Sequence, residues 1–221
     1  MRTFSILFLV LIYSACSETP VKTESAEAVS VYNIDSFLAK FTEIAFDSLK
    51  VYTTDQVDAD TSFYKGNPLD SVDAPFIATL YGNDVFESSR EYLSQFYACY
   101  KFKIDEERMG LIVRCPSEYV SSFLEVFEYN CKTSKVKHLI NLSELWGDAG
   151  DSYERCSYLF RAGKGIGVYQ YNMSSYDHSV EDEKDSTVDK WYNHYTIRIS
   201  EGKFDTLSRD TGHYLPYWMK R

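Results

Sequence analysis

The sequence has no long apolar run, no closely spaced cysteine pair and no surplus of basic residues. Its leading apolar segment, residues 4–13, is far shorter than the run of about 20 residues that a transmembrane helix needs. The missing CxxC spacing argues against a zinc ribbon or a thioredoxin-like site. The formal net charge of −10 repels phosphates, so we expect no nucleic-acid partner.

Familiar catalytic patterns are missing as well. The histidines form no HExxH, and no serine lies in a GxSxG elbow. Residues 163–167, GKGIG, lack the GK[ST] ending of a phosphate-binding loop and are expected to form a hairpin turn. The sequence therefore favours a binding or structural role over an enzymatic one, and it indicates no catalytic residue and no cofactor.

The N-terminus has the layout of a targeting segment. Arg2 precedes the apolar residues 4–13, and the small residues Ser14 and Ala15 follow them. A positive end, a short apolar stretch and small residues are typical of a secretory signal peptide. We therefore expect residues 1–15 to be removed from the mature chain.

Ser14, Ala15 and Cys16 resemble the lipobox of bacterial lipoproteins, in which the cysteine carries lipid and becomes the first mature residue. Tyr13 differs from the aliphatic residue that is usual one position earlier. The resemblance is confined to the leader. It implies that lipid on Cys16 anchors the protein to a membrane of the cell envelope, facing the periplasm or the cell surface. The alternative is an ordinary signal peptide cleaved after Ser17.

The rest of the chain divides into a tether and one domain. Residues 16–33 are polar and suit a flexible tether, and residues 34–221 are enough for a single domain. The 19 tyrosines and 14 phenylalanines favour strands. Short alternating segments separated by turns indicate antiparallel pairing. We predict a single, mainly β antiparallel domain (a sandwich, an open barrel or a curved meander) with one N-terminal amphipathic helix.

Three local predictions accompany this fold. The spacing of apolar residues over 34–49 predicts the N-terminal helix, with Asn33 or Asp35 as its cap. Residues 74–82 predict a strand that ends in a turn, and residues 143–152 predict a loop.

Aromatic residues crowd the C-terminal part of the chain. Trp191, Tyr192, Tyr195 and Trp218 lie there, together with His194. Exposed aromatic rings stack on sugars and pack against proteins, so these residues are candidates for binding a glycan or a protein partner. The same residues could instead fill the core of a small β domain.

A carboxylate cluster gives the alternative function. Asp148, Asp151 and Glu154 lie close together on a glycine-containing segment, where their oxygen atoms could ligate a cation. They are the best residues for an extracytoplasmic hydrolase with a carboxylate or metal site. Asp and Gly are also the residues that tight turns need, so a plain turn explains them too.

The remaining cysteines raise the question of a disulfide. If Cys16 carries lipid, four cysteines are left in an oxidising compartment. A turn centred near Glu107 would place Cys99 opposite Cys115, and a disulfide would then form if the two residues are a close antiparallel pair. The alternative is two buried thiols.

We predict that Cys16 is the acylated N-terminus of the mature protein. Mass spectrometry of protein from its native membrane should detect an acylated peptide that begins at Cys16. A Cys16→Ser variant should leave the membrane fraction because it carries no lipid. An unmodified mature end at Glu18 would contradict the prediction.

Overall fold

The computed structural model describes residues 32–53, 64–82, 90–117, 122–200 and 203–210. Every helix and strand in it belongs to one unit, Asn33–Arg221. In chain order the elements are α1 Ile34–Ala39, β1 Thr42–Glu43, β2 Ser48–Val51, β3 Asn67–Pro68, α3 Asp73–Tyr81, α5 Arg90–Leu93, β4 Tyr97–Lys103, β5 Arg108–Cys115, β6 Phe123–Asn130, β7 Lys135–Asp148, β8 Asp151–Ala162, β9 Gly165–Asp177, η1 His178–Val180, β10 Val188–Ser200 and β11 Lys203–Asp210. No helix among these residues is long and apolar enough to span a membrane.

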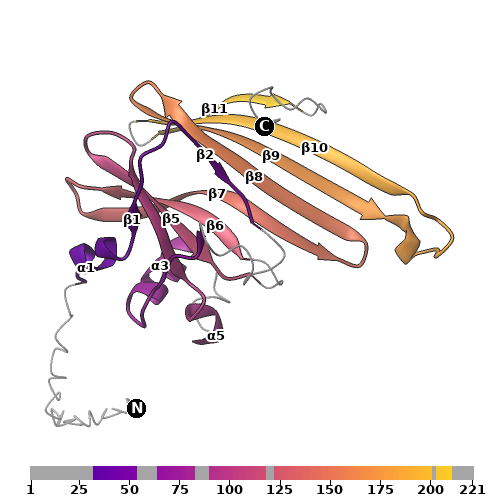
Figure 1. The fold of residues 1–221 in the computed structure, drawn as a ribbon, viewed down its shortest axis with the longest axis horizontal. Helices are drawn as coiled ribbons and strands as arrows, with labels where there is room; N and C mark the ends of the chain where they lie inside the picture. Colours follow the sequence, from indigo (N-terminus) through magenta and orange to yellow (C-terminus); the bar gives the residue numbers. More distant parts are fainter. Residues whose placement is uncertain (1–31, 54–63, 83–89, 118–121, 201–202, 211–221) are drawn as a thin grey trace, which may run out of the picture. The chain divides into compact units, whose positions relative to one another are not determined.

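The strands of the described residues join one 11-stranded sheet with the main order β1-β4-β5-β6-β7-β8-β9-β10-β11. From β4 to β11 each strand pairs antiparallel with the next one along the chain, and the colours of neighbouring strands in Figure 1 follow that order. β1 joins β4 in parallel, β3 pairs with β4, and β2 pairs with β8. The predicted mainly β, antiparallel fold with an N-terminal helix is therefore confirmed.

The long strand β7 changes partner part-way along its length. It pairs with β6 as far as Ser143, which lies opposite Leu124. It then pairs with β8 from Glu144, which lies opposite Arg155. β2 pairs with the part of β8 that lies beyond this contact with β7. Two register shifts in the β6–β7 pair accompany the change, and the sheet divides at β7 into two parts.

The main core lies between the two parts of the sheet. Phe102 and Ile112 on β4 and β5 share one buried cluster with Leu159, Val168 and Ile197 on β8, β9 and β10. Adjacent strands are about 4.8 Å apart, so β5 and β9 would be separated by about 19 Å in a flat sheet. One shared cluster therefore requires the sheet to fold over itself, which removes apolar side chains of both parts from water.

Two glycines make room for aromatic rings on the sheet. A Cβ on Gly110 would meet the ring of Phe102 at 2.2 Å, and a Cβ on Gly167 would meet the ring of Phe160 at 2.3 Å. Each glycine lies directly opposite its phenylalanine in the neighbouring strand. Each ring therefore covers the strand beside it, in space that any larger residue would fill.

The N-terminal helix is shorter than the sequence predicts. Asn33 caps its start by accepting a backbone hydrogen bond at 3.1 Å, as predicted, but the helix ends at Ala39. Thr42–Glu43 forms β1 instead, and the Ile44 N–H donates to a carbonyl of β4 at 2.9 Å. Pairing with an open sheet edge outweighs the helical apolar pattern of residues 34–49, because it satisfies backbone groups of both strands.

Residues 74–81 lie in the helix α3, so the predicted strand is wrong. Asp70 accepts hydrogen bonds from two backbone N–H groups near the start of α3. Gly82 ends the helix with a left-handed φ of 74°. Ile77 is fully buried on the helix. A short apolar run is compatible with a strand or with a buried helix. Here Asp70 before the run and Gly82 after it favour the helix.

Of the two alternatives for Cys99 and Cys115, the structure has the two buried thiols and not the disulfide. The described cysteines Cys99, Cys115, Cys131 and Cys156 are all free. Cys99 falls at an irregularity of the β4–β5 register, where Ala98 lies opposite Val113. Cys115 is therefore not its cross-strand partner, and both residues are buried thiols.

Gly110→Ala should destabilise the fold because the new methyl group collides with the buried ring of Phe102. Overpacking of this kind lowers the free energy of unfolding by about 1–3 kcal/mol, which urea denaturation measures. Adding Phe102→Leu should recover part of the loss, so the double variant should be more stable than the two single effects predict. If the stability losses of Gly110→Ala and Phe102→Leu were strictly additive in the double variant, the contact between the two residues would be contradicted.

Candidate functional site

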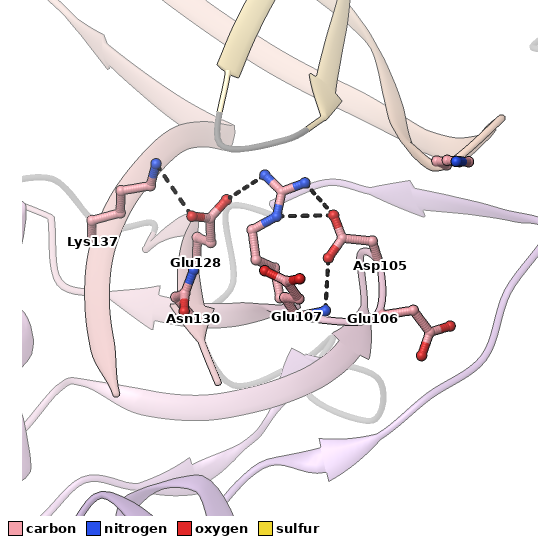
Figure 2. A pocket seen from close by; sticks show the side chains of 8 residues that line it. Asp105, Glu106, Glu107, Glu128, Asn130 and Lys137 are labelled. Atoms are coloured by element: carbon pink, nitrogen blue, oxygen red, sulfur yellow. Dashed lines mark hydrogen bonds and ion pairs between the residues drawn. The ribbon is translucent and has the colours of Figure 1, made fainter. Parts of the chain in front are cut away.

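A charged pocket lies at one end of the sheet, beside the β4–β5, β6–β7 and β8–β9 turns. Its volume is about 520 Å³, and we call it the turn-end pocket. It is lined by Asp105, Glu106, Glu107, Arg108, Glu128, Asn130, Lys137 and Lys164. Figure 2 shows Lys137 and Asp105 on either side of the carboxylate of Glu128.

Arg108 holds one wall of this pocket together. Its Nε donates to Asp105 at 2.9 Å, Nη2 donates to the same carboxylate, and Nη1 lies 3.4 Å from Glu128. Lys137 Nζ lies 3.2 Å from the other oxygen of Glu128. Burial would raise the pKa of Asp105, but the hydrogen bonds from Arg108 and from the backbone outweigh it and hold that pKa below its ordinary value.

The ion pairs of this wall are mainly structural. The side chains of Arg108 and Glu128 are only 6% and 5% exposed. A buried charge that loses its partner is strongly destabilising, so this network fixes the β4–β5 turn against β6. We therefore interpret Arg108 as a clamp rather than as a ligand-binding group.

A second candidate surface lies on the part of β7, β8, β9 and β10 next to the β7–β8 turn. Trp146 on β7 lies opposite Tyr153 on β8, and Ser174 on β9 lies opposite both Tyr153 and Trp191 on β10. Directly opposed residues point to the same face of a sheet. We call Trp146, Tyr153, Ser174 and Trp191 the aromatic row. The rings of Trp146 and Tyr153 stack at 5.6 Å, and Trp191 is 52% exposed.

A row of polar side chains runs alongside the aromatic row. Glu144, Arg155, Asn172 and Asn193 lie opposite one another on the same four strands, and we call them the polar row. Arg155 lies 3.4 Å from Glu144 and donates to Asn172 at 3.3 Å. It also donates to the hydroxyl oxygen of Tyr153 at 2.7 Å. The guanidinium is thus fixed between the two rows.

The predicted aromatic residues divide between the two faces of β10, because side chains alternate along a strand. Trp191 and Tyr195 lie on the face of the aromatic row, whereas Tyr192 and His194 lie on the other. His194 is only 3% exposed, and its Nδ1 lies 2.7 Å from a tyrosine hydroxyl. Trp218 lies outside the described residues.

The structure does not bring the predicted carboxylates together. Asp148 and Asp151 lie opposite each other across the two-residue turn Ala149–Gly150, so β7 and β8 run through the segment that the sequence predicts as a loop. Glu154 lies farther along β8 and points to the opposite face. Among the residues that the structure describes, no group of three His, Cys, Asp or Glu side chains could hold a metal ion.

A buried carboxyl–imidazole pair lies near the polar row. Glu125 on β6 has no exposed surface, and its Oε2 lies 2.8 Å from His138 Nε2. Burial raises the pKa of Glu125, while His138 and then Arg155 offset part of the effect. Glu125 Oε1 and the Oδ1 of Asn141, which lies opposite Glu125, are the two buried side-chain polar atoms that lack a hydrogen-bond partner in the described residues. A proton held on Glu125 lowers the cost of that burial.

The sequence does not single out Trp146, Tyr153 or Arg155 as site residues. A local signal exists in the pair Ala149–Gly150, whose glycine suits a two-residue hairpin turn between two strands. The order of β7, β8, β9 and β10 then places one residue of each strand in the same row. That placement depends on register, which no local pattern shows.

No family model matches the chain, and no curated protein or solved structure matches it.

Glu125→Gln should change how stability depends on pH. The pKa of Glu125 is higher in the folded state than in the unfolded state. Its stabilising contribution is fully present below the unfolded pKa of about 4.3. Stability is then lost as the pH rises through the folded pKa, because the unfolded state releases this proton more readily. Glutamine has no such proton to lose. Urea titrations between about pH 4 and pH 8 should show the variant gaining stability relative to the wild type as the pH rises.

The control for this experiment is Glu106→Gln, because the Glu106 side chain is 89% exposed. Its stability relative to the wild type should change little with pH, since exposed ion pairs contribute little. A Glu125→Gln difference that stays constant over the whole pH range would contradict the raised pKa.

Proposed function

We propose that this protein is a lipid-anchored, extracytoplasmic binding protein whose aromatic row binds a glycan. The observation that carries the proposal is the aromatic row itself. Trp146 and Trp191 are far apart in the sequence, yet the register places them in one row on one face of the sheet. The alternative hydrolase would depend on Asp148, Asp151 and Glu154, which do not share one face.

The chemistry of the two rows suits a sugar better than a protein partner. An aromatic ring offers a flat apolar surface, while the hydroxyl groups of a sugar need donors and acceptors nearby. Arg155 and Glu144 supply such groups next to Tyr153. Because mutual contacts already hold them, little side-chain entropy is lost when a ligand binds. A protein-binding surface would instead have an apolar centre with few charged residues.

Anchoring at Cys16 would support this function. A lipid and the polar tether of residues 16–33 would keep the domain at the envelope while leaving its binding face free to turn. A ligand on the same surface is then present at a high effective concentration. Under those conditions a modest affinity of the aromatic row is enough to keep the ligand bound.

Trp191→Ala should weaken glycan binding about tenfold, which corresponds to about 1.4 kcal/mol, because it removes an exposed ring from the row. A glycan array on purified protein identifies the ligand, and calorimetric titration with that ligand measures the change. The fold should be unaffected, since the Trp191 side chain is half exposed.

The matched control is Tyr192→Ala, which removes the neighbouring aromatic ring from the opposite face of β10. This variant should bind like the wild type. Equal losses in Trp191→Ala and Tyr192→Ala, or an array on which the wild-type protein binds no glycan, would contradict the proposal.

A further inference from the structure

A second cavity of about 480 Å³ adjoins the turn-end pocket, and we propose that it binds a phosphate group. The two cavities share Asp105, Glu106 and Lys164. The second one, here called the anion cavity, is also lined by Lys103, Ile104, Arg161 and Gly163. Its walls are the end of β4, the β4–β5 turn, the end of β8 and the β8–β9 turn.

The two carboxylates of the anion cavity are already paired with bases. Asp105 forms its ion pair with the buried Arg108, which belongs to the clamp described above. Glu106 lies 2.9 Å from Lys103 Nζ, with both side chains exposed. Figure 2 shows Glu106 pointing away from the Asp105 carboxylate. These pairings leave little negative charge to repel an anion from the cavity.

Arg161 and Lys164 supply positive charge that is not balanced in this way. Neither of them forms an ion pair with a carboxylate of the described residues. Both are exposed at the cavity. The chain as a whole carries a net charge of −10, so two unbalanced bases on one cavity are a local exception to the average charge.

The guanidinium of Arg161 is held in place before any ligand binds. Its Nη1 donates to the Lys103 carbonyl at 2.6 Å, and the group lies 5.2 Å from the ring centre of Phe46. Phe46 in turn packs edge-on against the buried Phe102 at 5.2 Å. The other N–H donors of Arg161 stay available for two parallel hydrogen bonds to an oxyanion, the geometry that phosphate accepts.

The β8–β9 turn leaves open space beside this group. Gly163 has a left-handed φ of 62°, and no atom lies within 4 Å of the place where its Cβ would be. The next residue, Lys164, adds a mobile point charge to the fixed fork of Arg161. An arginine fork, a lysine and an open turn together favour a group with several negative oxygens, such as phosphate.

The anion cavity is independent of the glycan proposal. Tyr153 and Arg161 both lie on β8, and the strand rise of about 3.3 Å per residue separates them by about 26 Å. Loss of one site should therefore leave the other intact. The phosphate could belong to a lipid headgroup or to a soluble molecule, and both present the same chemistry to Arg161.

The first experiment titrates inorganic phosphate into the non-lipidated Cys16→Ser protein at constant ionic strength, with calorimetric detection. The protein should bind phosphate, and Arg161→Gln and Lys164→Gln should each weaken binding about tenfold or more, as expected for a lost charge-assisted hydrogen bond. Arg161→Lys should retain part of the affinity, because lysine keeps the positive charge but lacks the paired N–H donors of the guanidinium.

The matched control is Lys190→Gln, which makes the same change in net charge on β10, far from the cavity. It should bind phosphate like the parent protein. Absence of phosphate binding by the parent, or an equal loss in Lys190→Gln and Lys164→Gln, would overturn the proposal.

A second arm identifies the source of the phosphate. The same proteins are sedimented with vesicles of phosphatidylglycerol or of phosphatidylcholine. Binding to phosphatidylglycerol that Lys164→Gln abolishes and Lys190→Gln does not would support the site and assign it to a lipid headgroup. Phosphate binding without vesicle binding would support the site and assign it to a soluble ligand.

Discussion

The structure depends on the change of partner along β7. Backbone N–H and C=O groups must be paired wherever they are buried, so a strand can leave one neighbour only where another takes over. β7 leaves β6 after Ser143 and joins β8 at Glu144, while β2 pairs with β8 farther on. This exchange lets the sheet fold over its own core on one side of β7. On the other side it gives β7 to β10 a shared face, which carries the aromatic and polar rows.

Charge is distributed unevenly over this frame. The net charge of −10 describes the chain as a whole, but the turns at one end of the sheet gather several lysines and arginines. Most of them are bound to carboxylates, as Arg108 is to Asp105 and Glu128. Two exposed bases, Arg161 and Lys164, are not so bound among the described residues. An average over composition hides such a local excess, since fields act over about 10 Å and not over a whole molecule.

Local patterns predicted the strands better than the helices. The short segments between turns are strands in the structure, as β4 Tyr97–Lys103 and β6 Phe123–Asn130 show. Residues 34–49 fit a helical pattern, yet the helix stops at Ala39 because the edge of β4 offers backbone partners. Residues 74–81 carry strand-like apolar residues, yet backbone hydrogen bonds to Asp70 at their start and the left-handed Gly82 after their end favour a helix. The choice between a disulfide and two buried thiols depended on a register irregularity at Cys99, which cannot be seen in the sequence.

The sequence by itself determined that this is a mainly β, antiparallel domain with a capped helix at its start, because alternation, turn residues and caps are local properties of the chain. It also provided the aromatic residues from which a binding surface could be built. The tertiary structure alone decided that Trp146, Tyr153 and Trp191 share a face, that His194 is buried, and that Arg161 and Lys164 meet at one cavity. The physical reason is the register of strand pairing. A shift of one residue moves every side chain of a strand to the other face of the sheet, and the register follows from contacts summed over the whole core.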